Sequence, residues 1–312
     1  FTVKLSTIGF YYDFTRLFAK LHGQMTPSGP RVEVTNYATH TSGYLFENAP
    51  GMRHVFLPLA ARLSSGQAAQ DQDTLDWVGQ YLVISGLAPE RARRISAKYT
   101  GFFLQEFRKT WPDVVIISGD TRMQARAAVL ACRALGIAHF YFEQGPFGTT
   151  ILDPAGVNCT ASFAKTFEIS APVATQNTQT QAPASRPKVA ERKAVRTLDY
   201  LVQPLLLGLG CHEIREEKKF FKQVVQQLWK LTKGTKAAEA APRSDDPFVL
   251  VVGQVPTDAN FSLNSPYSHP LDLVRDVQRM FPGEKILFRE HPLFIGSYGD
   301  AFYQHFDQHE AL

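Results

Sequence analysis

FVLVVGQ at residues 248–254 opens the part of the chain that decides the predicted fold. It is followed by three segments: a polar loop at 255–269, LDLVRDVQRMF at 271–281 and KILFREHP at 285–292. Apolar runs on either side of a segment with helical spacing predict a strand, a loop, a helix and a second strand. Ligands of open α/β sheets bind beyond the carboxyl ends of the strands. Six polar residues stand there and form a candidate site for an anionic ligand: Gln254, Asp258, Asn260, Arg289, Glu290 and His291.

The same pattern occurs earlier in the chain. PDVVIISGD at 112–120 and IAHFYFEQG at 137–145 are apolar runs that flank an Ala- and Leu-rich helical segment. This arrangement predicts parallel strands whose carboxyl ends lie side by side. Asp120, Arg122 and Glu143 would then collect at one edge, although Asp120 also suits the N-cap of the following helix.

Further strand and helix patterns complete the predicted N-terminal half. Strands are expected at 2–10 and 31–38 with a helix between them, and mostly helix at 74–108. Residues 39–73 are rich in Gly, Ser and Pro, so we expect irregular structure there.

Composition divides the chain into four parts. Residues 171–193 are poor in apolar side chains and rich in Thr, Gln, Ala and Pro, which is typical of a linker. The predicted organisation is therefore α/β, with these parts: an N-terminal Rossmann-like domain at 1–170, a linker at 171–196, a bridging helix at 197–232 and a second Rossmann-like domain at 248–312.

Overall composition excludes several classes of protein. The 312 residues carry a formal net charge of +4, which favours an acidic partner such as a nucleotide or a phospholipid head group but is too small to indicate nucleic acid. No apolar run is long enough for a membrane span. Three widely spaced cysteines indicate neither a disulfide framework nor a zinc site. The dinucleotide, P-loop, zinc-protease and GxSxG hydrolase motifs are all absent.

The remaining candidate residues favour sugar-nucleotide chemistry. Glu143 and Asp258 are carboxylates on strand ends of different domains, and such pairs serve as nucleophile and acid/base in glycosyl transfer. Arg122, Arg289 and His291 suit a phosphate or a carboxylate.

Several blocks of the sequence resemble the bacterial capsular polysaccharide β-Kdo transferase family. The blocks follow in one order: SGDTRMQARAAVLACRALGIAHFYFEQG at 118–145, FEQGPFGTTILDPAGVNCTASF at 142–163, TLDYLVQPLLL at 197–207, VVGQVPTDANFSLNSPYS at 251–268 and LFREHP at 287–292. One departure is the position before HP, where the family usually has Lys and this chain has REHP.

The resemblance implies a GT-B-like pair of Rossmann-like domains and retaining transfer of Kdo from CMP-β-Kdo to a lipid-linked or polysaccharide acceptor. It implies that Asp258 is the nucleophile, that Glu143 is the second carboxylate, and that His291 and Gln254 bind the nucleotide. Arg122 and Arg289 are predicted to contact the carboxylate or phosphate of the ligand because of their positive charge, and not because of the resemblance. No cofactor and no metal are expected, and the protein would work in the cytoplasm, in peripheral contact with the anionic inner membrane face.

Two alternatives remain open at this point. Within enzymes, the donor could be another CMP-ulosonic acid or another sugar nucleotide. In a different class, the chain could be a non-catalytic scaffold of a polysaccharide assembly complex. The second reading arises because the family continues well beyond the HP motif, so we expect the C-terminal domain to be incomplete.

Overall fold

The computed structural model forms two compact units, Phe1–Val225 (unit 1) and Gln226–Leu312 (unit 2). The residues that it describes are 2–9, 12–25, 31–45, 51–66, 71–84, 86–145, 149–158, 160–163, 199, 202, 206, 247–256, 258–291, 294–296 and 298–308. The predicted linker and most of the predicted bridging helix lie outside these residues. Each unit is described by itself.

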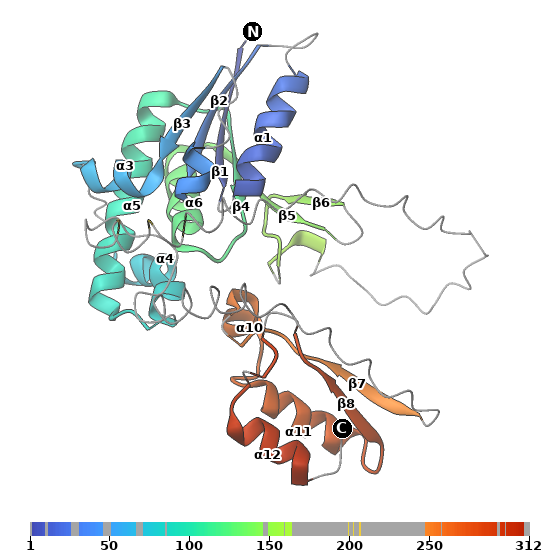
Figure 1. Ribbon diagram of the computed structural model, residues 1–312. Coiled ribbons are helices and arrows are strands. Elements are labelled where there is room, and N and C mark those ends of the chain that lie inside the picture. Colours follow the sequence, from blue (N-terminus) through green and yellow to red (C-terminus); the bar gives the residue numbers. More distant parts are fainter. Residues whose placement is uncertain are drawn as a thin grey trace. The chain divides into compact units, whose positions relative to one another are not determined.

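Unit 1 contains a six-stranded sheet with helices on both faces (Figure 1). Its elements are β1 (Thr2–Gly9), α1 (Tyr12–Met25), β2 (Arg31–Ala38), α2 (Thr41–Leu45), β3 (Met52–Phe56), α3 (Leu57–Leu63), α4 (Gln72–Ile84), α5 (Pro89–Thr110), β4 (Val114–Ser118), α6 (Met123–Leu135), β5 (Ala138–Gln144) and β6 (Thr150–Asp153). The strand order is β3-β2-β1-β4-β5-β6. All neighbouring pairs are parallel except β5 and β6.

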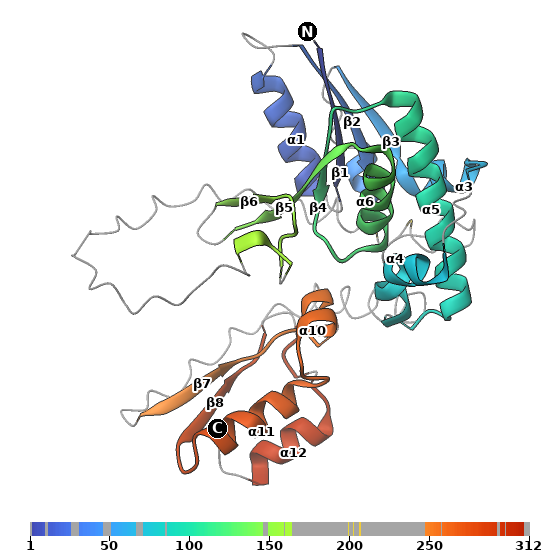
Figure 2. The same cartoon turned by 180° about the vertical axis from the view of Figure 1, so that it is seen from behind.

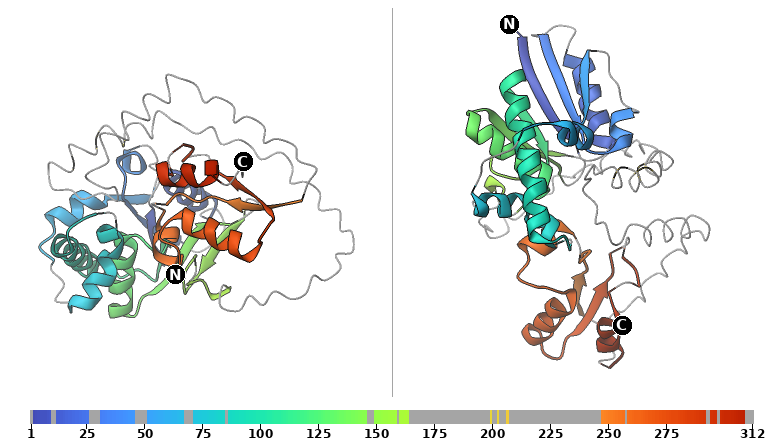
Figure 3. Two further views of the ribbon diagram at one scale, coloured as in Figure 1. Left: turned by 90° about the horizontal axis from the view of Figure 1, so that it is seen from below. Right: turned by 90° about the vertical axis from the view of Figure 1, so that its left-hand side faces the viewer.

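This strand order confirms the predicted α/β, Rossmann-like fold of unit 1. The chain winds outward from β1 in one direction and from β4 in the other, so the sheet is doubly wound with its switch point between these two strands. Seen from both sides, α1 lies on one side of the sheet and α5 on the other (Figures 1 and 2). Figure 3 shows the long helix α5 running beside the strands.

The core of unit 1 explains why these elements form. Strand β4 has the sequence VVIIS and buries Val115 and Ile117 completely, as a central parallel strand requires. Helix α6 buries most of its Ala-rich length against α5 and α4. It ends at Gly136, whose φ of 67° lies in the left-handed region that glycine adopts readily.

The expectation of irregular structure at residues 39–73 was wrong. This stretch contains α2, β3 and α3, and β3 pairs in parallel with β2 at the edge of the sheet. These elements have five to seven residues each, which is too short for a periodic pattern to distinguish them from a loop. Pairing with β2 provides the stability that local sequence does not.

Unit 2 has a smaller α/β arrangement around two parallel strands. Its elements are β7 (Phe248–Val252), α10 (Ala259–Asn264), α11 (Pro270–Met280), β8 (Lys285–Arg289) and α12 (Asp300–Gln308). Residues on one face of the strand pair join α11 and α12 in a single core, which includes Val251, Val274, Ile286 and Phe302. On the other face, alternate residues of β7 are exposed, and Val252 retains 64% of its accessible surface.

A capping box begins helix α11. The side chain of His269 accepts a hydrogen bond from the amide of Leu271 at 3.1 Å, and Asp272 accepts one from the amide of His269 at 3.1 Å. The strand, loop, helix and strand predicted for residues 248–292 are therefore confirmed, with the short helix α10 added inside the predicted loop.

The described part of the predicted bridging helix also has contacts. Residues 199, 202 and 206 are helical. Asp199 is buried and accepts a hydrogen bond from the amide of Ser42 at 2.7 Å, which joins this segment to unit 1. None of the helices that the structure describes is long and apolar enough to cross a membrane.

Candidate functional site

The carboxyl ends of β7 and β8 are joined by the hydroxyl of Tyr298. This hydroxyl accepts a hydrogen bond from the amide of His291 at 3.0 Å and donates one to the carbonyl of Gln254 at 3.3 Å. The amide of Gly253 also donates to the carbonyl of Arg289 at 2.8 Å, which extends the ladder past the strands. Two predicted nucleotide contacts, Gln254 and His291, are therefore fixed in the same backbone network.

Tyr298 keeps its bridging proton because it is buried. Only 2% of its surface is exposed, and it packs at ring-centroid distances of 5.3 Å from Phe288 and 5.0 Å from Phe302. Burial raises the pKa of the Tyr298 hydroxyl above its usual range. The bridge therefore stays neutral and can act as donor and acceptor at once.

Glu290, predicted with Arg289 and His291 as part of the candidate site, bonds to groups of the chain itself. Its carboxylate accepts hydrogen bonds from the Tyr303 hydroxyl at 2.5 Å and from the Gly296 amide at 3.1 Å. Burial, aided by this bond to Glu290, raises the pKa of Tyr303 to about 12. Arg289 is the last residue of β8 and is exposed, so its guanidinium group is accessible to solvent at this strand end.

Asp258 occupies the turn that leads into α10. Its amide donates to the carbonyl of Val255 at 2.9 Å, and its own carbonyl accepts from the amide of Ser262 at 2.9 Å. The backbone on both sides of the Asp258 side chain is thus held in place, and the residue is half-buried. Asn260 lies in the first turn of α10. The Gln254 side-chain oxygen accepts a hydrogen bond from the amide of Val255 at 3.0 Å.

In unit 1, Asp120 holds the loop that follows β6. Its carboxylate accepts hydrogen bonds from the amides of Val157 at 3.1 Å and Asn158 at 3.3 Å, from the Thr160 hydroxyl at 2.9 Å and from the Asn158 side chain. A Cβ on Gly156 would lie 2.9 Å from the same carboxylate, so glycine permits the close approach. The predicted ligand contact is thus occupied by the chain's own donors.

A second carboxylate, Asp153, organises the same loop and was not predicted. It accepts hydrogen bonds from the amides of Ala155 at 2.7 Å and Ser162 at 3.1 Å and from the Ser162 hydroxyl. These bonds lower the pKa of the Asp153 carboxyl, and the bond from the Ser162 hydroxyl has the largest effect. The sequence DPAG carries a recognisable signal, because Asp at the start of a Pro- and Gly-containing turn commonly bonds to the backbone two residues further on.

Arg122 and Arg126 connect the end of β4 to helix α4. The guanidinium carbon of Arg122 lies 4.4 Å from the centre of the Tyr81 ring, which is a cation–π geometry. Arg126 is only 9% exposed and donates to the carbonyls of Trp77 at 2.6 Å and Asp120 at 3.3 Å. No local pattern marks Arg126, because Trp77 lies on a separate helix, 49 positions earlier in the sequence.

Glu143 stands at the end of β5, opposite Ile151 of β6 in the register. Its neighbour Phe142 packs on Phe14 and Phe18 of α1, at centroid distances of 5.3 and 5.5 Å. Successive strand residues point to opposite faces, so the half-buried Glu143 side chain points away from α1. One of its oxygens accepts a hydrogen bond from the amide of Gln144 at 3.0 Å.

Buried polar residues near the ends of β1 and β2 form a group that sequence reasoning missed. Asn36 is completely buried and accepts a hydrogen bond from the Thr7 hydroxyl at 2.8 Å. Thr39 donates to the carbonyl of Gly9 at 3.0 Å and lies 3.0 Å from His40 Nδ1. These bonds fix the strand ends next to the switch point. No signal in the sequence separates such residues from ordinary strand Thr and Asn.

The predicted site residues thus fall into two groups. Gln254, Asp258, Asn260, Arg289, Glu290 and His291 belong to the carboxyl edge of unit 2, and Asp120, Arg122 and Glu143 belong to the carboxyl edge of unit 1. Across the described ranges, no three His, Cys, Asp or Glu side chains gather as metal ligands would.

Comparison with known proteins adds little to this geometry. No family model matches the chain, and no curated protein matches it. Similar solved structures include a UDP-N-acetylglucosamine 2-epimerase (16% identity, TM-score 0.28, 45% of this chain and 31% of that one). Another is the glycosyltransferase VinC, with 18% identity and a TM-score of 0.24 over 45% of this chain and 33% of that one. A third is the UDP-GlcNAc 2-epimerase of Neisseria meningitidis, with 13% identity and a TM-score of 0.28 over 93% of this chain and 66% of that one.

The chain therefore spans less than two thirds of the length of each of these structures. TM-scores of this size are too low to indicate a shared activity. The fold assignment rests on the strand order and the parallel pairing of the chain itself.

Proposed function

We propose that this chain is a retaining glycosyltransferase that uses a CMP-activated sugar, with CMP-Kdo as the donor. The observation that carries the proposal is the position of Asp258, Gln254 and His291. All three follow the carboxyl ends of β7 and β8, where open α/β sheets bind nucleotides. They also fall within the blocks that resemble the β-Kdo transferases.

The proposed reaction has two displacements. Asp258 attacks the anomeric carbon of the donor, a bond to CMP breaks, and a glycosyl ester forms on the carboxylate. An acceptor hydroxyl then attacks the same carbon, the ester bond to Asp258 breaks, and Glu143 takes the hydroxyl proton. Two inversions give net retention. The reaction requires Glu143 and Asp258 to act on one bound sugar.

Two side chains at the end of β8 would stabilise the leaving nucleotide. CMP leaves with a single phosphate, and Arg289 and the imidazole of His291 are suited to its charge. Because the Tyr298 bridge fixes the His291 backbone relative to Gln254, the site needs little reorganisation when the donor binds.

Intact mass spectrometry tests the proposal directly. The protein is incubated with CMP-Kdo without acceptor, alongside Asp258→Ala and the control Asp300→Asn, which changes an exposed carboxylate at the start of α12. We expect a Kdo-sized adduct on the native protein and on the control, and no adduct on Asp258→Ala. Donors built on other ulosonic acids and other sugar nucleotides, run in parallel, identify the preferred sugar.

Each outcome separates the alternatives. An adduct only with another CMP-ulosonic acid changes the donor and keeps the mechanism. An adduct that persists in Asp258→Ala rejects Asp258 as the nucleophile. If the protein forms no adduct, releases no CMP and shows no CMP binding by calorimetry, the enzyme proposal fails and a scaffold role is favoured.

A further inference from the structure

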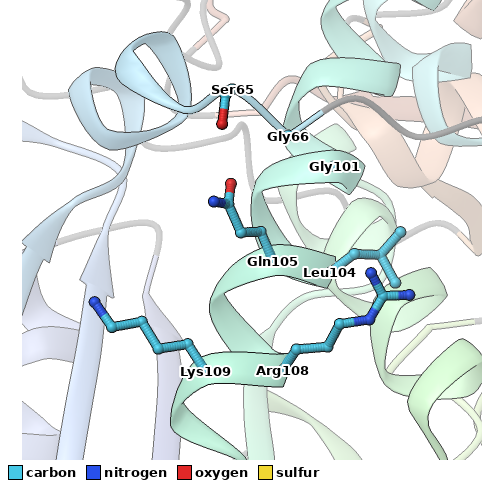
Figure 4. A pocket seen from close by; sticks show the side chains of 7 residues that line it. All are labelled: Ser65, Gly66, Gly101, Leu104, Gln105, Arg108 and Lys109. Atoms are coloured by element: carbon cyan, nitrogen blue, oxygen red, sulfur yellow. The ribbon is translucent and has the colours of Figure 1, made fainter.

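A groove on unit 1 lies between helix α5 and the loop after α3. It has a volume of about 490 Å³ and is lined by Ser65, Gly66, Gly101, Leu104, Gln105, Arg108 and Lys109. Figure 4 shows the loop above and the α5 side chains below, with Lys109 and Arg108 extending from the same turn of the helix in different directions.

Two glycines shape this groove. A Cβ on Gly66 would lie 2.5 Å from the carbonyl oxygen of Gly101, so the loop can approach the helix backbone only without a side chain there. The Gly66 amide donates to the Ser64 hydroxyl at 3.0 Å, which in turn donates to Gln105 at 3.0 Å. The groove is therefore held by specific contacts on both sides.

The charge of the groove is positive. Arg108 and Lys109 are exposed, and neither forms an ion pair within the described part of the chain. The nearby acid Glu106 is already neutralised, because it accepts a hydrogen bond from Arg53 at 2.7 Å and its side chain is only 12% exposed. Two cations thus face solvent without a local counter-charge.

Exposed apolar side chains stand on the helix that leads into this groove. Leu59 and Leu63 lie one turn apart on α3 and keep 44% and 74% of their surfaces exposed, whereas Leu57 and Ala61 are buried on the opposite face. Arg62 adds a third cation between them. Trp111, two residues beyond the groove residue Lys109 in sequence, closes helix α5 and is 56% exposed.

We propose that this surface docks on an anionic phospholipid membrane. The α3–α5 surface consists of Leu59, Arg62, Leu63, Arg108, Lys109 and Trp111. Cations beside protruding leucines and an interfacial tryptophan are the combination that holds peripheral proteins at the level of the lipid head groups. The groove between Arg108 and Ser65 takes a lipid phosphate, and Leu59 and Leu63 enter the acyl boundary. The inference goes beyond the proposed transfer reaction and does not depend on it.

Vesicle flotation with the full chain tests this docking. The vesicles contain phosphatidylcholine alone or phosphatidylcholine with a one-third share of phosphatidylglycerol. We expect flotation with the anionic vesicles only. The Arg108→Ser/Lys109→Ser variant should lower the partition coefficient by about 25-fold, at roughly fivefold for each cation near an anionic surface. The Leu59→Ser/Leu63→Ser variant should lower it by about tenfold, because less apolar surface enters the membrane.

The matched control is Lys20→Ser/Arg31→Ser, which removes the same charge from exposed positions on α1 and β2. It should reduce binding far less than the groove variant, and thermal melting checks that every variant is folded. Equal flotation with neutral and anionic vesicles, equal loss in the control, or full binding by the leucine variant would each overturn the proposal.

Two further results also count against docking on a membrane. If no vesicle binds the protein, an acidic protein surface becomes the favoured partner. If inorganic phosphate raises the melting temperature of the native protein but not of Arg108→Ser/Lys109→Ser, and vesicles do not bind, the groove is a site for free phosphate.

Discussion

The hydroxyl of Tyr298 donates a hydrogen bond to the backbone carbonyl of Gln254 at 3.3 Å, across 44 positions of the sequence. The same oxygen accepts from the amide of His291. One buried side chain therefore fixes the carboxyl ends of β7 and β8 relative to each other. Any ligand that contacts Gln254 and His291 depends on this residue without touching it.

Replacement of Tyr298 by Phe should loosen this edge. The change removes one hydroxyl and leaves a carbonyl and an amide without their partner, which costs about 1–3 kcal/mol. We expect a lower free energy of unfolding in urea and faster amide exchange at His291. Tyr267→Phe is the control, since its hydroxyl is not part of the bridge. Unchanged exchange at His291 would show that the bridge does not hold the strand end.

Replacement of Gly253 by Ala should destabilise the same strand end for a steric reason. A Cβ at this position would lie 2.5 Å from the Phe288 ring and 2.7 Å from the Tyr298 hydroxyl. Forcing a methyl group into packed surroundings costs about 1–3 kcal/mol. Gly9→Ala is a suitable control, because the nearest atoms there are 3.5 Å away. Equal unfolding midpoints for the two variants would contradict the close packing around Gly253.

The sequence was sufficient to predict which residues lie at the strand ends, but not which side chains hold those strand ends in place. Apolar runs on either side of helical segments predicted β4, β5, β7 and β8, and with them the strand-end positions of Glu143, Asp258 and His291. Tyr298 and Glu290 act through partners that no local pattern links to them. Their roles depend on how α12 and its preceding loop pack on the sheet, which a single sequence does not specify.

For Asp120, the sequence predicted the position of the residue but not its partners. Its place after a buried strand predicted a ligand contact, and its real neighbours are donors 37 to 40 residues further along the chain. A carboxylate at a strand end suits a substrate and a distant loop equally well. Only the folded positions of Val157, Asn158 and Thr160 show which donors it meets.

Replacement of Asp120 by Ala should release the loop that carries Val157, Asn158 and Thr160. Hydrogen bonds to a charged group contribute more than neutral ones, so we expect a loss of about 2–3 kcal/mol in the free energy of unfolding. Limited proteolysis should cut faster within this loop than in the native protein. The control is Asp71→Ala, which removes an exposed carboxylate that bonds only locally, to Thr74. Because Asp71 bonds to the amide of Thr74 in the first turn of α4, as an N-cap residue does, its loss should cost only about 1 kcal/mol.

A variant that retains native proteolysis and stability would show that Asp120 does not hold the loop. In that case its carboxylate would be available to a ligand, as the sequence alone predicted. The two readings thus differ in stability as well as in any later measurement of donor binding.

Cys132 should make the protein less stable at alkaline pH. The residue is completely buried in α6, and burial raises the pKa of its thiol from 9.0 to about 12. The unfolded chain ionises the thiol first, so the contribution of this group is present below pH 9.0 and is lost as pH rises toward about 12. The loss cannot exceed about 1.4 kcal/mol per pH unit.

Urea unfolding at several pH values between about 8 and about 10 measures this slope. Cys132→Ala removes the ionising group and adds a small cavity, so we expect a variant that is less stable at neutral pH and loses less stability as the pH rises. The comparison with the native chain isolates the thiol, because burial also raises the pKa of Tyr141 and that group remains in both proteins. Parallel slopes would mean that the thiol is not buried in the folded state, since an exposed thiol ionises alike in folded and unfolded chains.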